Sequence, residues 1–308
     1  MSLSKRILVI GATGVIGKVL LDALLNAKDE FETIGIFTSP ATVESKNDMI
    51  ESFKARGPDF DTIVSAVGRF AIDKQVDLIK LAEQSPSIVR FIPSEYGTDI
   101  AFDTSSATEK PHQKKLKVRN YLEKSGEVNR LKYTYLVSGP FADLYAGFFE
   151  AEPRAGHFDT IKYEAILAGD AGDASGGGPV GMTTVADVGR ALVGVLRHPE
   201  ASDNKAVRVH SYVCTPKEML AEYERQTGKK WKVSYTSMEE LKKIEEDAWA
   251  AEHPVSAIFT LRRIWAEGKT LYEKTENEAI GLTKTDTLEM VVQANIQTPQ
   301  SAFQSGKL

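Results

Sequence analysis

The sequence predicts an α/β fold in which a doubly wound parallel sheet carries helices on both faces. Short aliphatic runs alternate with segments of helical apolar spacing through the first half of the 308-residue chain, and a glycine-rich turn follows the first run. Aliphatic runs of this kind are typical of strands that are buried on both faces. Ligands of such sheets bind beyond the carboxyl ends of the strands.

Composition excludes several classes of protein. The hydrophobic fraction of 42% and the charged fraction of 26% are those of a globular protein, and the net charge of -5 gives no general attraction for nucleic acid or an anionic membrane. The single cysteine, Cys214, excludes an internal disulfide, and we interpret it as a core residue. The five histidines lack metal-ligand spacing, so no metal is predicted. Because no apolar run approaches the roughly 20 residues that span a bilayer, we expect a cytoplasmic protein.

The first predicted strand and the turn after it indicate a nucleotide site. Gly11 allows a tight turn after residues 7–10, Gly14 lets the backbone approach a pyrophosphate, and Gly17 lets the next helix pack closely on the strand. The phosphates would then meet free N–H groups and the positive end of the helix dipole. A purely structural glycine turn is the alternative. The predicted pyrophosphate-binding residues are Gly11, Thr13, Gly14, Val15, Ile16 and Gly17.

The end of the second predicted strand, residues 33–37, indicates which dinucleotide binds. An NAD site needs Asp or Glu about 20 residues beyond the glycines, to hold the ribose 2′-OH. This strand ends instead in Thr38 and Ser39, with Lys46 further on. The missing acid removes repulsion of a 2′-phosphate and Lys46 offers a cation, so the sequence favours NADP(H) over NAD. A solvated helix position is the alternative for Lys46.

The remaining pattern divides the chain into two regions. Further strands are expected at 62–67, 89–92 and 132–137, and helices at 43–56, 72–84, from Pro111, at 184–196 and at 216–227. The stretch 169–178, rich in Gly and Asp, is interpreted as a surface connection. We expect a dinucleotide-binding domain at 1–145 and a smaller α/β substrate region at 146–308, partly interleaved with the first domain.

Three later motifs accompany the glycine turn: residues 65–68 (Ser-Ala-Val-Gly), 90–97 (Arg-Phe-Ile-Pro-Ser-Glu-Tyr-Gly), and 133–135 with Phe141. Together they resemble the isoflavone reductase and phenylcoumaran benzylic ether reductase group of the NmrA-like atypical short-chain dehydrogenases. The resemblance implies a Rossmann-type fold and an NADPH-dependent reductase of small aromatic or enone-type molecules. It also implies that Gly68 lies near the nicotinamide, and that Phe141 and Tyr145 line an apolar substrate pocket.

The resemblance also implies a catalytic lysine. In the family, a lysine three residues ahead of an aliphatic-Arg pair does the acid/base work, and the pair at 118–119 here selects Lys115. On a helix begun at Pro111, Lys115 shares the inward side with Val118, but Lys114 lies nearly as close to that side, so spacing alone does not separate them. A dry apolar pocket would lower the pKa of such a lysine towards a range useful for a general base.

Two other interpretations of this stretch stay open. The lysines belong to a basic patch that would simply solvate the helix, made of Lys110, Lys114, Lys115, Lys117 and Arg119. His112 offers a second proton carrier, although we expect it to be exposed at the helix start.

In one respect the chain departs from the family pattern. Between the second strand and residue 62 the family has helix, strand and helix, whereas about one helix fits here, so the sheet is expected to be one edge strand short. This favours a second hypothesis, a non-catalytic NADP-binding regulator or redox sensor that acts through a protein partner. The first hypothesis remains the reductase, whose partner is a small-molecule substrate.

Overall fold

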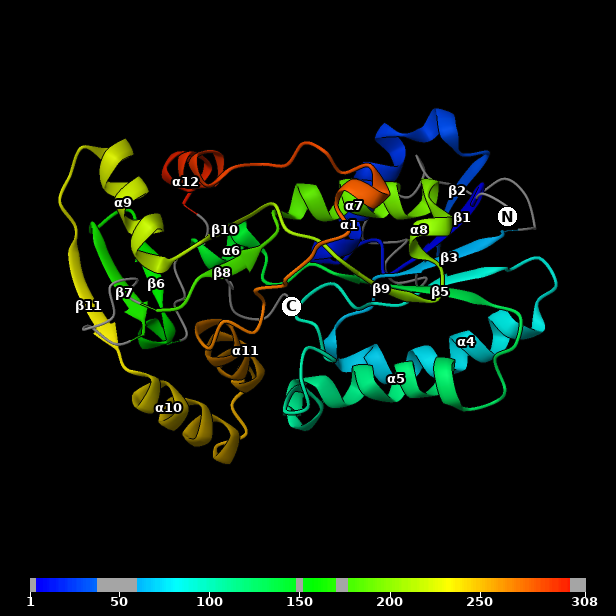
Figure 1. The fold of residues 1–308 in the computed structure, drawn as a ribbon, viewed down its shortest axis with the longest axis horizontal. Helices are drawn as coiled ribbons and strands as arrows, with labels where there is room; N and C mark the ends of the chain where they lie inside the picture. Colours follow the sequence, from blue (N-terminus) through cyan, green and yellow to red (C-terminus); the bar gives the residue numbers. More distant parts are fainter. Residues whose placement is uncertain (1–3, 38–59, 148–151, 170–176, 300–308) are drawn as a thin grey trace.

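The computed structural model describes residues 4–37, 60–147, 152–169 and 177–299. Its elements form two neighbouring groups, one around a large parallel sheet and the other around smaller sheets (Figure 1). The short 3₁₀ helices in these ranges are η1 (Lys28–Glu30), η2 (Arg69–Lys74), η3 (Ser106–Thr108), η4 (Lys110–His112), η5 (Pro153–Ala155) and η6 (Glu278–Ile280).

The large sheet is parallel, with the order β2-β1-β3-β4-β5-β9 in the described residues. Its strands are β1 (Arg6–Ile10), β2 (Thr33–Phe37), β3 (Thr62–Ser65), β4 (Arg90–Ile92), β5 (Lys132–Val137) and β9 (Lys205–Arg208). Strand order reverses at β1, whose neighbours are β2 on one side and β3 on the other. In sheets of this kind ligands bind at such a reversal, beyond the carboxyl ends of the strands.

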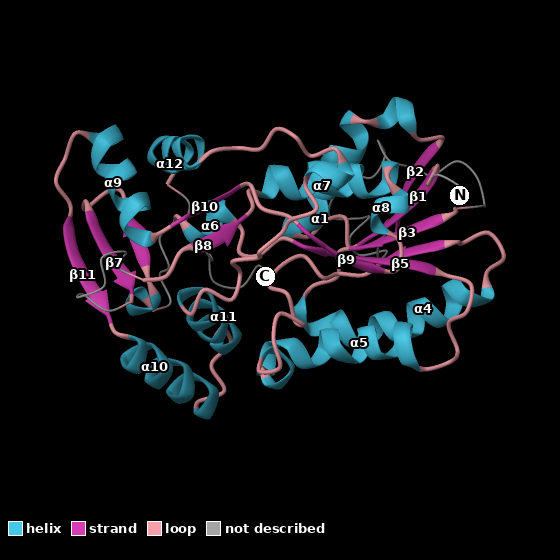
Figure 2. Cartoon of the chain, viewed as in Figure 1, coloured by secondary structure: helices cyan, strands magenta, loops and turns pink. Residues whose placement is uncertain are grey.

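Helices cover both faces of this sheet, as the sequence predicts (Figure 2). One face carries α1 (Val15–Asn26), α7 (Val185–Arg197) and α8 (Pro199–Ser202), and the other carries α4 (Gln75–Gln84) and α5 (Gln113–Lys124). Gly189 of α7 allows the close contact with α1, because a Cβ there would lie 2.8 Å from the Cβ of Ala23. The second half of the chain therefore supplies both a strand and a helix layer to the first group.

The second group has two small sheets. One has the order β11-β7-β6, and the other pairs β8 with β10 antiparallel. Their strands are β6 (His157–Asp159), β7 (Glu164–Ala168), β8 (Val180–Met182), β10 (Tyr212–Cys214) and β11 (Lys232–Thr236). The helices around them are α6 (Ala142–Tyr145), α9 (Pro216–Thr227), α10 (Met238–Ala250), α11 (Ser256–Ala266) and α12 (Leu288–Gln297). Tyr223, Trp231 and Trp265 lie in the apolar core of this group.

The predicted doubly wound α/β class is confirmed, and the differences are local. The helix expected from Pro111 begins as η4 and becomes α-helical at Gln113, and η2 precedes the helix expected at 72–84. The expected helix at 43–56, the missing edge strand and most of the stretch 169–178 lie outside the described residues. Cys214 is buried, as predicted for a core residue, and burial raises the pKa of its thiol to about 12.

In the described ranges, every helix is too short or too polar to cross a bilayer.

Candidate active site

The carboxyl ends of β1, β3, β4 and β5 lie at one edge of the parallel sheet, and hydrogen bonds join the loops that follow them. A backbone bond of 2.7 Å connects the residue after β3 to the last residue of β1. The hydroxyl of Ser94, after β4, donates to the carbonyl oxygen of Val67 at 2.9 Å. The backbone N–H of Ser138, after β5, donates to the carbonyl oxygen of Gly97 at 3.1 Å. The backbones at these four strand ends are therefore held next to one another along this edge.

The three glycines of the turn after β1 have different roles. Gly11 has φ of 81°, and a Cβ there would lie 2.5 Å from the carbonyl oxygen of Ala66. At Gly17 a Cβ would lie 2.0 Å from the carbonyl oxygen of Gly11. At Gly14 the closest atom would be 3.4 Å away, and the residue is exposed. The fold therefore requires glycine at 11 and 17, while glycine at 14 leaves space for a ligand.

The start of α1 is suited to an anion. Gly14 is the N-cap residue and offers no side-chain acceptor to the first N–H groups of α1. The first turn of α1, which the structure describes in full, holds no acidic residue. Free N–H groups and the positive end of the helix dipole therefore face the glycine turn. The turn and helix fit the pyrophosphate of a dinucleotide, which needs N–H donors and close backbone approach.

The other residues expected at the cofactor site are placed differently. Val15 is exposed, Thr13 is half-buried, and Ile16 packs against the apolar core beneath the sheet. Gly68 is exposed after β3, and a Cβ there would meet no described atom within 4 Å. The expected 2′-phosphate residues Thr38, Ser39 and Lys46 lie outside the described residues.

The structure separates Lys115 from Lys114. Lys115 is half-buried, and its Nζ donates to the carbonyl oxygen of Glu95 at 2.6 Å, in the loop after β4. Lys114 is exposed, and its Nζ lies 3.5 Å from a carboxylate oxygen of Asp73 and 3.2 Å from the carbonyl oxygen of Phe70. Burial lowers the pKa of Lys115, opposed by the charge of Glu95. The shift is in the direction that makes a lysine a better general base than a solvated one.

Sequence reasoning missed the ion pair that supports this lysine. The carboxylate of Glu95 is buried, and Arg119 binds it through two hydrogen bonds of 3.1 and 3.0 Å. Arg119 also lies 3.6 Å from a carboxylate oxygen of Asp99, and its guanidinium lies 4.3 Å from the centre of the Tyr135 ring. The signal was present: Arg119 lies four residues after Lys115 on one helix face, and Glu95 follows a buried strand.

Breaking this pair is expected to destabilise the fold. Arg119→Met leaves the Glu95 carboxylate buried without its partner, which should cost about 3–5 kcal/mol of unfolding free energy. Lys117→Met is the matched control, because Lys117 is exposed on the same helix, and its cost should stay within about 0.5 kcal/mol. Urea unfolding at pH 7 measures both variants. Equal stability of the two would show that the Glu95 pair does not hold the loop.

His112 is buried, so the expectation that it is exposed is wrong. Its side chain is 2% exposed, and Nδ1 lies 2.7 Å from the carbonyl oxygen of Ser106. Burial lowers the pKa of His112, which favours the neutral ring. A helix start is normally exposed, but here α11 packs against η4, and Lys110 of η4 lies over the Trp249 ring of α10. Sequence spacing gives no sign of these contacts.

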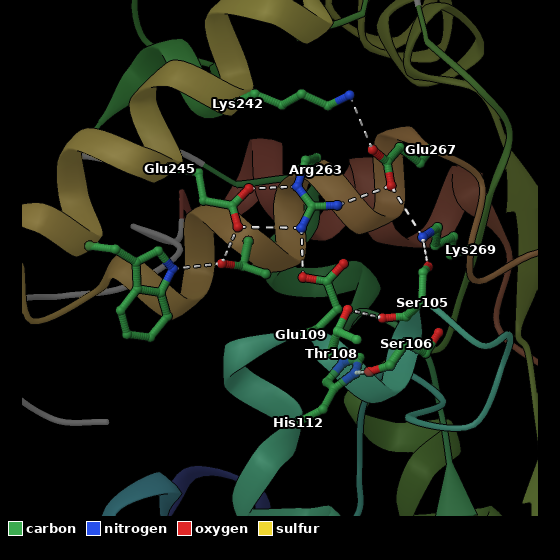
Figure 3. Close-up of polar contacts among 12 residues, drawn as sticks. Ser105, Ser106, Thr108, Glu109, His112, Lys242, Glu245, Arg263, Glu267 and Lys269 are labelled. Carbon is green, nitrogen blue, oxygen red and sulfur yellow. Dashed lines mark hydrogen bonds and ion pairs between the residues drawn. The ribbon is translucent and has the colours of Figure 1, made fainter.

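A polar network fastens the segment before α5 to α10 and α11, as Figure 3 shows. Arg263 of α11 is nearly buried and binds Glu109 at 2.7 Å, Glu245 at 2.5 Å and Glu267 at 3.0 Å. Lys269 donates to the hydroxyl of Ser105 at 2.5 Å. The start of the helix that carries Lys115 is thereby fixed against the second group of elements.

The two expected substrate residues lie just after β5, where the two groups meet. Phe141 is half-buried and precedes α6. Tyr145 is 8% exposed; its ring centre lies 5.9 Å from that of Trp265, and the Arg262 guanidinium lies 4.8 Å from the Tyr145 ring centre. Burial raises the pKa of Tyr145 to about 12, so its hydroxyl stays protonated. One hollow of the described surface lies beside Lys110 and Trp249, and none of the predicted site residues lines it.

The fold and the glycine turn define a dinucleotide-binding α/β protein. The sequence pattern of the NmrA-like family matches residues 3–289, so the chain belongs to the NmrA-like family.

Individual relatives agree with the family resemblance, which is thereby confirmed. The isoflavone reductase of Cicer arietinum is 28% identical, over 89% of this chain and 91% of that protein. Phenylcoumaran benzylic ether reductase PT1 of Pinus taeda is 26% identical, over 79% of this chain and 81% of that protein. The solved complex of leucoanthocyanidin reductase with NADPH from Vitis vinifera superposes with a TM-score of 0.73 at 19% identity, over 95% of this chain and 100% of that one.

Proposed function

We propose that this NADP-dependent oxidoreductase reduces small aromatic or enone-type molecules of the phenylpropanoid kind, with Lys115 as the acid/base group. The observation that carries the proposal is the position of Lys115. The residue is half-buried, and its Nζ is held at 2.6 Å from the Glu95 carbonyl oxygen, at the edge where the glycine turn would bind the dinucleotide. The names of the matched reductases support the substrate class.

In this proposal each loop at the strand ends has one task. Gly11, Thr13, Gly14 and the first turn of α1 bind the pyrophosphate through backbone N–H groups. Gly68 leaves room beside the nicotinamide, because no described side chain or backbone atom crowds it. NADPH, when bound, supplies a hydride for an electrophilic carbon of the substrate. Lys115 moves the accompanying proton, either taking it from a phenol or relaying it to an oxyanion.

The substrate region is proposed to comprise residues 146–308, partly interleaved with the dinucleotide-binding domain at 1–145, because β9 and α7 of this range pack in the parallel-sheet group. Phe141 and Tyr145 lie at the border between the two. Tyr145 and Trp265 pack against each other in the apolar core of the second group, with ring centres 5.9 Å apart, so their rings would form the inner wall of this region. Apolar walls of this kind discriminate weakly between similar ring systems, so the neighbouring loops decide which substrate fits.

We expect the protein to bind NADPH at least about tenfold more tightly than NADH, a difference of ~1.4 kcal/mol. β2 ends at Phe37 beside the glycine turn, and no acid stands at 38–40 to repel a 2′-phosphate. Isothermal titration calorimetry with both reduced cofactors measures the preference. Equal affinities, or tighter binding of NADH, would contradict the proposed cofactor choice.

The reductase activity itself is tested by a substrate screen. Stopped-flow absorbance at 340 nm follows NADPH oxidation with quinones, enones and phenolic ethers. Turnover with at least one aromatic or enone compound supports the proposal. Tight NADPH binding without oxidation by any of them would favour the sensor hypothesis, whose sequence basis lies outside the described residues.

A further inference from the structure

Arg69 differs from every other arginine that the structure describes. It opens η2 directly after Gly68, in the loop that follows β3, and it is half-buried. Within the described residues it is the one arginine whose side chain has no hydrogen bond, ion pair or ring contact. The partnered arginines are Arg6, Arg90, Arg119, Arg130, Arg154, Arg190, Arg197, Arg208, Arg225, Arg262 and Arg263.

The cost of this arrangement is electrostatic. Withdrawing a guanidinium from water without an opposing charge destabilises its charged form, and burial accordingly lowers the pKa of Arg69. The side chain remains protonated, because an arginine does not lose its proton in proteins at neutral pH. Arginine is also the residue that recognises carboxylate and phosphate through paired donors. An unpaired arginine at a ligand edge is therefore suited to an anion.

The neighbouring carboxylates already have other cationic partners. η2 is tied to the start of α5 where Lys114 contacts the Phe70 carbonyl oxygen and the Asp73 carboxylate. The carboxylate of Glu95 binds Arg119 through both of its oxygens. The positive charge of Arg69 also contributes to the lowered pKa of Lys115, so the two cations lie close enough to repel each other. The nearby carboxylates of Glu95 and Asp99 act on Lys115 but are paired with Arg119 and Arg208, and neither forms an ion pair with Arg69.

The apolar residue beside Arg69 restricts the class of ligand further. Phe70, next to Arg69 in the chain, is 75% exposed, and Gly68 on the other side has no atom crowding it. We propose that Arg69 binds an anionic oxygen group, a carboxylate or a phosphate, of a molecule whose flat apolar part lies against Phe70. This inference rests on the proposed function, because it places the anion beside the nicotinamide end of the cofactor site. The group comes either from the substrate or from the dinucleotide.

The two sources are separated by calorimetry on wild type, Arg69→Gln and a control, Lys74→Gln. Lys74 is an exposed cation on the same 3₁₀ helix, and it loses the same charge. The ligands are NADP⁺, 4-hydroxycinnamate and methyl 4-hydroxycinnamate, and the two cinnamates are titrated with and without NADP⁺. The ester keeps the ring and the enone-type double bond but lacks the negative charge.

If the substrate supplies the anion, wild type binds the acid at least tenfold more tightly than the ester, and only Arg69→Gln loses this preference while keeping its NADP⁺ affinity. If the dinucleotide supplies it, only Arg69→Gln binds NADP⁺ at least tenfold more weakly, and the ratio between acid and ester is unchanged. If Arg69→Gln binds every ligand with the same affinity as Lys74→Gln, the proposal is overturned.

A structural role for Arg69 makes a different prediction. Because Arg69 has no partner in the described chain, Arg69→Gln is expected to keep or raise the wild-type Tm, measured by differential scanning calorimetry. A lowered Tm together with unchanged ligand binding would show that Arg69 serves the fold, against the proposal. If the proposed function is wrong, the wild type will not bind NADP⁺. The titrations of acid and ester without cofactor still decide the role of Arg69 in that case.

Discussion

Lys115→Ala is expected to lower kcat by about 10²–10⁴-fold, the usual contribution of a positioned acid/base group. The physical reason is the place of its Nζ, half-buried at the strand-end edge and held by the Glu95 carbonyl oxygen. The affinity for NADPH should change little, because the glycine turn and the start of α1 are proposed to bind the phosphates. Stopped-flow oxidation of NADPH with an accepted substrate measures the loss.

Lys114→Ala is the matched control for this variant. The Lys114 side chain is exposed and contacts Asp73 and Phe70, so its removal should leave kcat nearly unchanged. A loss at position 114 alone would show that the wrong lysine is assigned. Equal small losses at both positions would show that neither lysine carries the proton.

The pH profile gives a second readout for Lys115. Because burial lowers its pKa, the wild-type profile of kcat/KM should show an inflection below the ordinary lysine value, and this inflection should disappear in Lys115→Ala. If Lys115 takes a proton from the substrate, kcat/KM rises as the pH increases through this pKa. If Lys115 donates a proton to an oxyanion, kcat/KM falls over the same range. A profile that the substitution does not change would contradict the assignment.

Gly14→Val is expected to weaken NADPH binding by at least about 100-fold, which corresponds to ~2.8 kcal/mol. A branched side chain there occupies the space through which the pyrophosphate approaches the backbone. The fold should survive, because a Cβ at this position meets its closest atom at an ordinary 3.4 Å, and the changed N-cap costs about 1 kcal/mol or less. Calorimetry for binding and urea unfolding for stability check the two parts.

Gly17→Ala is the contrasting variant. Its Cβ would lie 2.0 Å from the Gly11 carbonyl oxygen, so the turn must shift, which should cost about 1–3 kcal/mol of stability. Normal NADPH binding by Gly14→Val would move the phosphate site away from the turn. Unchanged stability of Gly17→Ala would show that helix α1 does not need to lie this close to the Gly11 carbonyl oxygen.

The parallel sheet could be predicted from sequence because its signals are local. Aliphatic runs gave β2 and β5 at their observed bounds, and helical spacing with a proline at its start gave α9 at 216–227. The small sheets of the second half were not foreseen. β6, β8 and β10 have three residues each, too few for a period of two to stand out.

The site was predictable to a lesser degree. A backbone that needs glycine shows this need in the sequence, so the glycine turn could be predicted from residue type. Burial of a polar side chain depends on partners far along the chain, and the sequence does not show them. His112 is buried against Ser106, in a segment whose Glu109 is bound by Arg263, 154 residues further along the chain. Lys115 differs from Lys114 because Lys115 contacts Glu95 whereas Lys114 contacts η2.

The most direct test of the proposed reductase is a single turnover with NADPH that carries deuterium in the transferable position at C4. Mass spectrometry of the product from an accepted aromatic or enone substrate then locates the label. We expect one deuterium on a substrate carbon with the wild type, and a strongly slowed transfer with Lys115→Ala. Oxidation of NADPH without deuterium in the product, or no oxidation with any such substrate, would contradict the proposed reductase.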